Sequence, residues 1–575
     1  MSEFDLVVRR GLVVDGSGGE PFEADVALKN GRIAAVGQVS GQGSEEIDAK
    51  GLLVTPGFVD VHTHYDGQVT WENRFAPSSE HGVTTVVMGN CAVGFAPCKA
   101  EHRELLMKLM EGVEEIPAAA MLQGIPWSWE SFPQFLDFLA TRHCDMDFAT
   151  QLPHGPLRVN VMGQRAADRE PATDDDLRLM GAIVQDSLRA GALGFTTSRT
   201  MNHRTVAGAL APTVTAAETE LRAIALAMKE VGQGVIETVG DWAATDENGS
   251  TEFEMWERIV AASGRPLSFS LVQDARAPTR WRDLLDMVDR AQSRGVDIKG
   301  QVCARAIGSL FGLQLSTHPF AACPSYKAIA KLPLAERVAR MRDPNLRRRI
   351  LTEDPEGLSQ QRRFTREAAS MFLLADPPDY CPPTSESLQA KAQARGVTAL
   401  ELAYDLMLED GGKAILYCPV ANYVAHNFDA VYEMMTSANT FLGIGDGGAH
   451  FGRVCDASQP TFVLANWTRG MGGRRLPLQT AVRKLTLETA QAVGLSDRGL
   501  LKAGYMGDLN VIDYDRLQLR RPEPRYDFPA GSMRLTQRAE GYVATVKSGQ
   551  VTYRDGQATQ ALPGRLIRGR QSAPR

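Results

Sequence analysis

Residues 55–67 read TPGFVDVHTHYDG, an apolar run that ends in two histidines one residue apart. In an extended strand, residues two apart point to the same face, so His62 and His64 can bind one metal ion side by side. A single histidine at such a place is more often a hydrogen-bonded structural residue. The pair follows a Pro-Gly turn and a buried strand, which favours a metal site whose other ligands come from the rest of the chain.

Apolar segments of strand length recur along the chain, and amphipathic helical segments separate most of them. The eight expected strands cover residues 57–62, 83–90, 147–152, 192–197, 234–239, 267–272, 296–302 and 441–446. One intervening helix begins at Thr173, a capping residue followed by three aspartates. Strands that alternate with helices form a parallel sheet, and eight of them predict an α/β protein with a (β/α)8 TIM-like barrel. A doubly wound open sheet is the alternative, but its G-x-G-x-x-G turn does not follow the first strand.

Both ends of the chain show the alternating pattern of short strands. Asn30-Gly31 lies between two apolar runs and predicts a hairpin, and Ser548-Gly549 marks a similar turn near the C-terminus. The expected domains are a small β-sandwich built from residues 1–55 and 491–575, the barrel over residues 56–490, and an insertion subdomain before the last barrel strand, at about 305–395. We place the insertion over the barrel mouth, where loops after the strands carry function.

The composition excludes several classes of protein. Hydrophobic residues make up 43% and charged residues 23% of the chain, as in soluble globular proteins. A formal charge of -7 and the lack of a basic run argue against a nucleic-acid partner. No segment has transmembrane length and the N-terminus lacks signal-peptide features, so we expect no membrane partner. Eight cysteines without a CxxC motif favour reduced thiols in the cytoplasm. A homo-oligomer is left open.

Polar side chains follow most of the expected strands at their carboxyl ends, where (β/α)8 enzymes place their active sites. Cys91 follows the second strand, Glu237 lies in the fifth, and Asp446 follows the eighth in GIGDGGAH. Zinc accepts imidazole, thiolate and carboxylate ligands together. Each residue also has a structural alternative: Cys91 as a small buried hydrophobe, Asp446 as a turn residue, and Glu237 with a basic partner. The expected metal site comprises His62, His64, Cys91, Glu237 and Asp446, with Cys91 and Glu237 either ligands or neighbours of ligands.

Three further residues follow the third and fourth strands and are candidates for substrate contacts. Arg199 could anchor a substrate carboxylate through two parallel hydrogen bonds, or form an ordinary ion pair. His154 or His203 could donate a hydrogen bond to an oxyanion. The chain has neither a G-x-S-x-G elbow nor a P-loop, so metal-assisted hydrolysis is the chemistry that remains.

The motifs VVDGSG, NGRIAAVG, PGFVDVHTH and GIGDGGAH, in this order, resemble those of the amidohydrolase superfamily. More narrowly, HTHYDGQVTWE, HGVTTVVMGNCAVGFAP, PHGPLRVNVMG and VKSGQVTYRDGQATQALPGRLIR look like the N-acyl-D-amino-acid deacylase (D-aminoacylase) family. The resemblance implies that His62, His64, Cys91 and Asp446 are ligands and that Asp446 also moves protons. It further implies one histidine each from strands five and six, but GVIETVGD and LSFSLVQDA contain none. We therefore expect one zinc ion (Zn2+), and the two missing histidines argue against a second.

The resemblance also implies an activity. We expect a metal-dependent amidohydrolase that acts on linear C–N amide bonds and deacylates N-acyl (D-)amino acids, with water activated by the ion and Asp446 as general base. A hydrolase of cyclic amides or small peptides is one alternative. The strand-four stretch GALGFTTSR lacks the modified lysine that many cyclic-amide hydrolases of the superfamily use. A non-catalytic scaffold that lost its metal is the other alternative.

Overall fold

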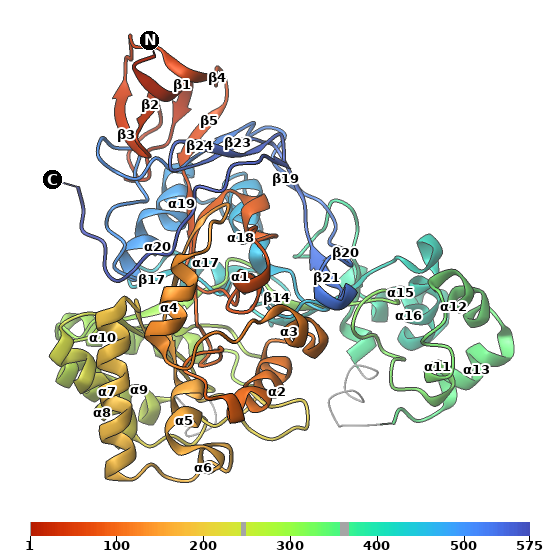
Figure 1. The fold of residues 1–575 in the computed structure, drawn as a ribbon. Coiled ribbons are helices and arrows are strands. Elements are labelled where there is room, and N and C mark those ends of the chain that lie inside the picture. Colours follow the sequence, from red (N-terminus) through yellow and green to blue (C-terminus); the bar gives the residue numbers. More distant parts are fainter. Residues whose placement is uncertain (1, 243–248, 357–366, 575) are drawn as a thin grey trace.

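A computed structural model describes residues 2–242, 249–356 and 367–574 of the chain. Figure 1 shows a small sheet that holds the N-terminal strands, a central body of helices and strands, and a helical lobe at one side. Within the described residues, no helix is both long enough and apolar enough to cross a bilayer.

The two ends of the chain share one nine-stranded sheet. Its strands are β1 (Phe4–Val13), β2 (Phe22–Lys29), β3 (Arg32–Gly37), β4 (Gly43–Asp48), β5 (Leu53–Pro56), β18 (Leu509–Ile512), β23 (Tyr542–Lys547), β24 (Gln550–Arg554) and β25 (Gln557–Ala558). The predicted turn at Asn30-Gly31 joins β2 to β3, and both residues have positive φ, 52° and 74°, as a tight hairpin turn requires. Hydrogen bonds link all nine strands, because β5 pairs with β1 on one side and β18 on the other. The two layers of the expected sandwich stay a prediction.

Every buried strand that the sequence predicts is present in the central body. The strands are β6 (Phe58–Asp60), β7 (Val83–Met88), β8 (Asp147–Thr150), β9 (Leu152–Pro153), β10 (Gly194–Ser198), β11 (Val235–Val239), β12 (Leu267–Ser270), β13 (Ile298–Val302) and β17 (Thr440–Leu442). The third predicted strand is divided into β8 and β9. The strands pair in parallel as two sheets, β6-β7-β8 and β17-β13-β12-β11-β10-β9.

Backbone hydrogen bonds join the edges of these two sheets. The Leu193 N–H donates to the Thr150 carbonyl at 3.0 Å, which links β10 to β8. On the other side, the Asp446 N–H donates to the His62 carbonyl at 3.0 Å, which links the end of β17 to the end of β6. The α/β class is confirmed. The closed (β/α)8 barrel stays a prediction, and these bonds support it.

Helices follow most of the parallel strands. Those of the central body are α1 (Gln68–Trp71), α2 (Arg103–Val113), α3 (Ala118–Gly124), α4 (Phe132–Ala140), α5 (His154–Met162), α6 (Gln164–Ala167), α7 (Asp174–Ala190), α8 (Glu218–Val231), α9 (Ser250–Ser263), α10 (Arg280–Ser293), α17 (Asp429–Thr436), α18 (Gln459–Phe462), α19 (Leu478–Leu485) and α20 (Leu487–Ala492). Helix α7 begins as predicted, because Thr173 caps it and forms a reciprocal capping box with Asp176. Met180, Val184 and Leu188 are buried on one face of α7.

Between β13 and α17, residues 307–421 form the helical lobe of Figure 1 and a three-stranded sheet. The elements of this segment are β14 (Ile307–Phe311), α11 (Pro324–Lys327), α12 (Leu334–Met341), α13 (Pro344–Thr352), β15 (Phe372–Leu373), α15 (Leu388–Arg395), α16 (Ala399–Met407) and β16 (Leu416–Ala421). The lobe has its own hydrophobic core, which runs from Phe311 to Cys418 and includes Tyr404 on α16. That core extends past the expected limit near residue 395. Residues 357–366 of the expected insertion lie outside the described residues.

Candidate metal centre

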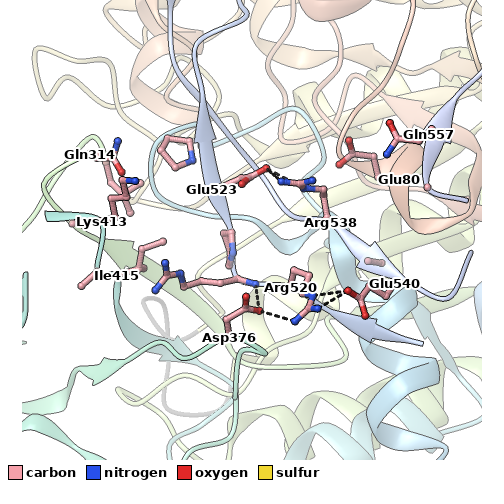
Figure 2. A pocket seen from close by; sticks show the side chains of 18 of the residues that line it. Glu80, Gln314, Asp376, Lys413, Ile415, Arg520, Glu523, Arg538, Glu540 and Gln557 are labelled. Carbon is pink, nitrogen blue, oxygen red and sulfur yellow. Dashed lines mark hydrogen bonds and ion pairs between the residues drawn. The ribbon is translucent and has the colours of Figure 1, made fainter. Parts of the chain in front are cut away.

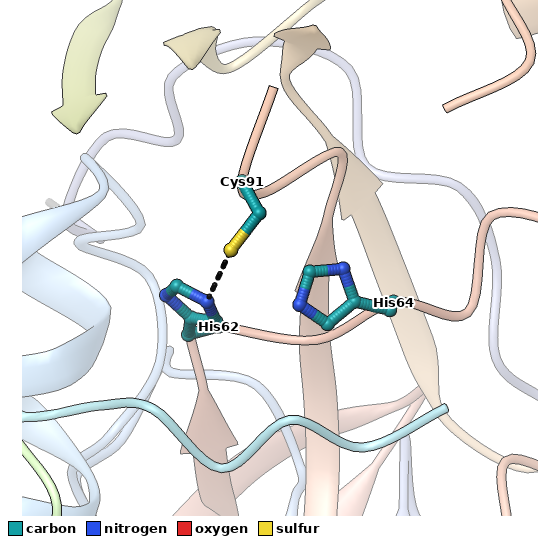
Figure 3. Close-up of side chains that lie close together, drawn as sticks. All are labelled: His62, His64 and Cys91. Atoms are coloured by element: carbon teal, nitrogen blue, oxygen red, sulfur yellow. Dashed lines mark hydrogen bonds between the residues drawn. The ribbon is translucent and has the colours of Figure 1, made fainter. Parts of the chain in front are cut away.

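The histidine pair and Cys91 meet at the carboxyl ends of β6 and β7 (Figure 3). Each residue offers one ligand atom, and the three atoms lie within 4.8 Å of one another. Cys91 Sγ is 3.4 Å from His62 Nε2. All three side chains are buried, so these potential ligands are shielded from water. The strand geometry that the sequence predicted for His62 and His64 therefore gathers a metal-ligand set.

Asp446, which follows β17, the last of the parallel strands in the sequence, also lies in this group. Its Oδ1 lies 3.4 Å from His62 Nε2 and 3.7 Å from His64 Nε2. Asp446 and Cys91 both have left-handed backbones, with φ of 48° and 55°. Such a conformation costs a non-glycine residue on the order of 1–3 kcal/mol, and such residues cluster at functional sites. The fold thus holds both side chains toward the histidine nitrogens at a cost in backbone strain.

Glu237 lies on the other side of the His62 ring, next to Nδ1. Its Oε1 is 3.6 Å from His62 Nδ1, and Gln301 Oε1 lies closer to the same nitrogen, at 3.0 Å. Gln301 Nε2 donates to Ser268 Oγ, so its oxygen is left to accept a hydrogen bond from His62 Nδ1–H. His62 Nε2 then carries the lone pair that faces Asp446 and Cys91. Glu237 therefore lies next to the candidate ligand His62, and its direct ligation stays a prediction.

Sequence reasoning missed a second buried glutamate. Glu114 is 2% exposed and follows α2, and its Oε1 is 3.5 Å from His64 Nδ1. It was missed because it follows a helix, whereas the candidates were sought at strand ends. Gln301 on β13 was missed because an amide in an apolar strand carries no metal signal. Asp60, which accepts a hydrogen bond from the His62 N–H at 3.2 Å, lies inside the quoted motif.

The electrostatics of the site call for a cation. Burial raises the pKa of Asp60, Asp66 and Glu237 to about 7 each. Burial also raises the pKa of Glu114 and of the Cys91 thiol, and neighbouring carboxylates add to both effects. Although burial acts on Asp446 in the same direction, the neighbouring imidazoles of His64 and His62 leave the pKa of Asp446 below its usual range. Negative groups thus outnumber positive ones, and a divalent cation would balance them.

Several buried polar atoms at the site have no hydrogen-bond partner, which also favours a bound cation. Within the described part of the chain, both ring nitrogens of His64, both carboxylate oxygens of Glu237 and Oε1 of Glu114 have no hydrogen-bond partner. Buried polar groups are normally paired, so each such atom needs an explanation. Imidazole, thiolate and carboxylate are the ligands that zinc takes in proteins. The residues present fit a zinc ion bound by the Nε2 atoms of the two histidines, with Asp446 and Cys91.

The three predicted substrate contacts have different surroundings. His154 is fully buried, and its ring nitrogens contact Glu220 Oε1 at 2.7 Å and Thr197 Oγ1 at 2.9 Å, so neither nitrogen is left for a substrate. Arg199 Nε pairs with Glu252 at 3.0 Å, which is the ordinary ion pair that the sequence left open.

His203 is partly exposed and lies on the chain that follows β10. Its Nδ1 is 2.7 Å from Ser198 Oγ. Desolvation, together with the charges of His450 and His64, lowers the pKa of His203 to about 3. Of the three candidates, His203 is the one whose pKa responds to the charges of His64 and Asp446. His450, which follows Asp446 in the motif GIGDGGAH, lies 3.7 Å from Glu114.

A separate charged pocket lies between the lobe and the short C-terminal strands β19 (Gln518–Leu519), β20 (Glu523–Arg525), β21 (Arg534–Thr536) and β22 (Ala539–Glu540) (Figure 2). Its volume is about 520 Å³. Arg520 pairs with Glu540 at 2.5 Å, and Arg538 pairs with Glu523 at 2.9 Å. The cations of this pocket are thus largely matched by its own carboxylates, and none of the predicted ligands lines it.

With this site and fold, the chain can be placed in a class: it belongs to the Amidohydrolase family, whose model matches residues 45–553. The predicted resemblance to amidohydrolases of the D-aminoacylase type is confirmed. A D-aminoacylase of Alcaligenes xylosoxydans xylosoxydans is 27% identical over 521 residues, which cover 89% of this chain and 88% of that protein.

Two solved structures show the same fold over nearly the whole chain. A D-aminoacylase structure concerned with the functional role of its binuclear metal centre has a TM-score of 0.65 and 24% identity, and covers 99% of this chain and 100% of its own. The N-acyl-D-glutamate deacylase of Bordetella bronchiseptica, in complex with zinc and a phosphonate inhibitor, has a TM-score of 0.63 and 21% identity, and covers 98% and 99%.

Proposed function

We propose that this protein is a zinc-dependent hydrolase of linear C–N amide bonds that deacylates N-acyl amino acids, with a site at the mouth of a closed (β/α)8 barrel. One observation carries the proposal: His62, His64, Cys91 and Asp446 converge from three strand ends on one buried point. Similar proteins are named D-aminoacylase and N-acyl-D-glutamate deacylase, which favours D-amino acids as the substrate class.

Zinc bound there would polarise the amide carbonyl and lower the pKa of a water molecule toward about 7. His62 and His64 would hold the ion through Nε2. Asp446 Oδ1, within 3.7 Å of both nitrogens, is the base placed to accept the proton of the attacking water and return it to the leaving amine. His203, whose pKa responds to the charges of His64 and Asp446, is the candidate for the substrate oxyanion.

A single ion is part of the proposal. Glu237 on strand five stands about where the family resemblance implies a histidine, and it faces the Nδ1 side of His62. Strand six contains no histidine. Among the described residues, one group of three potential ligands has the required spacing. The same missing histidines are the observation behind the second candidate, a scaffold without metal or catalysis.

The test combines metal analysis with a substrate panel. Purified protein expressed with zinc should contain about one ion per chain and hydrolyse N-acyl-D-amino acids faster than N-acyl-L-amino acids, hydantoins or short peptides. The variant Asp446→Asn should keep the fold and much of the zinc, and should lose kcat by about 10²–10⁴-fold, the usual contribution of acid–base catalysis. Near-normal turnover in this variant would refute the role of Asp446. Protein without bound metal or turnover would favour the scaffold.

A further inference from the structure

Glu114 lies between two histidines at the metal centre. Its Oε1 faces His64 Nδ1 at 3.5 Å, and its Oε2 faces His450 Nε2 at 3.7 Å. Its side chain is 2% exposed. Among the residues that the structure describes, no ion pair joins this carboxylate to an arginine or lysine. Arg453, on the loop that carries His450, pairs with the adjacent Glu115 at 2.7 Å. The surroundings of Glu114 therefore offer it imidazole groups as partners.

The two nitrogens of His64 have different neighbours. Nε2 faces Asp446 Oδ1 on the side of the metal ligands, whereas Nδ1 faces Glu114. An imidazole that binds a metal through Nε2 must carry its proton on Nδ1, and a carboxylate on that proton fixes the orientation of the ring and strengthens its binding. His62 is held in the same way at Nδ1, but by the neutral amide of Gln301.

We infer that Glu114 is a positioning residue of the metal centre, which orients His64 through Nδ1–H and raises its affinity for zinc. This inference rests on the proposed function. It assigns unequal roles to the two histidines: His64 is backed by a charged group and His62 by an amide.

Glu114 is not needed to hold its own segment of chain. The Glu114 backbone carbonyl accepts a hydrogen bond from the His450 N–H at 2.5 Å, and its N–H donates to the Met110 carbonyl at 2.9 Å. The adjacent Glu115 binds Arg453 on the same loop as His450. These contacts survive replacement of the Glu114 side chain, so a metal effect can be separated from a folding effect.

The experiment compares Glu114→Gln and Glu114→Ala with the matched control Glu115→Gln in the full-length protein. Zinc affinity is measured by competition with a chromophoric chelator, and the thermal midpoint of the metal-free form is measured in parallel. We expect Kd for zinc to rise by about 10–100-fold in both Glu114 variants. The metal-free midpoint should stay unchanged or rise in Glu114→Gln, and Glu115→Gln should bind zinc as the wild type does.

Three results would overturn the inference. One is a zinc Kd within twofold of wild type in Glu114→Gln. Another is an equal loss of affinity in Glu115→Gln. The third is a fall in the metal-free midpoint with no change in Kd, which would make Glu114 structural. If Glu114→Ala does not fold, Glu114→Gln alone decides. If the wild-type protein binds no zinc, the proposed function and this inference are both refuted. If the wild type binds zinc and hydrolyses amides, and Glu114→Gln binds zinc with the same affinity, only this inference is refuted.

Discussion

The unpaired carboxylate of Glu237 should make the metal-free protein more stable when it is neutralised. Glu237 is 1% exposed, and neither of its oxygens has a hydrogen-bond partner in the described residues. Burial raises the pKa of Glu237 from 4.5 to about 7. Since each pKa unit corresponds to about 1.4 kcal/mol, keeping Glu237 ionised at pH 8 costs the metal-free protein about 3 kcal/mol.

The sign and the pH window follow from the two pKa values of Glu237. Its pKa in the folded state lies above that in the unfolded chain, so the folded protein binds the proton more tightly and loses stability as pH rises from about 4.5 through 7. Glu237→Gln removes this dependence. The metal-free variant should match or slightly trail the wild type at pH 4.5 and exceed it by up to about 3 kcal/mol at pH 8.

Urea unfolding of the chelator-treated proteins at both pH values measures this difference in stability. The matched control is Glu220→Gln, because Glu220 is equally buried but pairs with His154 and Arg158, and its pKa is lowered. This control should lose stability at pH 8. A metal-free Glu237→Gln that is no more stable than wild type at pH 8 would refute the reasoning. With zinc bound, the advantage of the variant should shrink, because the ion offsets the buried negative charge.

Three further outcomes are expected. Cys91→Ala should weaken zinc binding at least tenfold, measured by chelator competition, because it removes a thiolate from the group around His62 Nε2; unchanged affinity would assign Cys91 to packing alone. Burial lowers the pKa of His81 from 6.5 to about 3, so between these pH values the folded state binds fewer protons than the unfolded chain. Stability therefore falls by about 1.4 kcal/mol for each unit by which pH drops below 6.5. Acid unfolding followed by circular dichroism should therefore be less steep in His81→Gln, and an identical profile would exclude His81 as a contributor. Thr173→Ala should cost about 1 kcal/mol through loss of the α7 cap, read as a lower thermal midpoint; no change would mean that water replaces the cap.

The strands and most of the candidate ligands could be predicted because their signals are local. A buried parallel strand is a short apolar run, and a ligand at its carboxyl end follows directly in sequence, as His62 and Cys91 do. Glu114 follows a helix, so only the packing of α2 against the loop after β17 reveals its proximity to His64. Glu237 faces Nδ1 of His62 because of the orientation of the imidazole ring. No pattern of residue types encodes that orientation. The single terminal sheet depends on β5 pairing on both edges, a long-range choice that alternation alone leaves open.

The pairing of β5 with a strand near the C-terminus bears on the order of synthesis, folding and metal binding. Strand β5 ends at Pro56, directly before the strand that delivers His62, and its outer neighbour β18 begins only at Leu509. Asp446 is likewise made hundreds of residues after the histidine pair. During synthesis, the first candidate ligands therefore leave the ribosome long before β18, the strand that pairs with β5. Zinc acquisition is expected to follow completion of the chain, and a protein that loses its C-terminal strands should fail at metal loading as well as at folding.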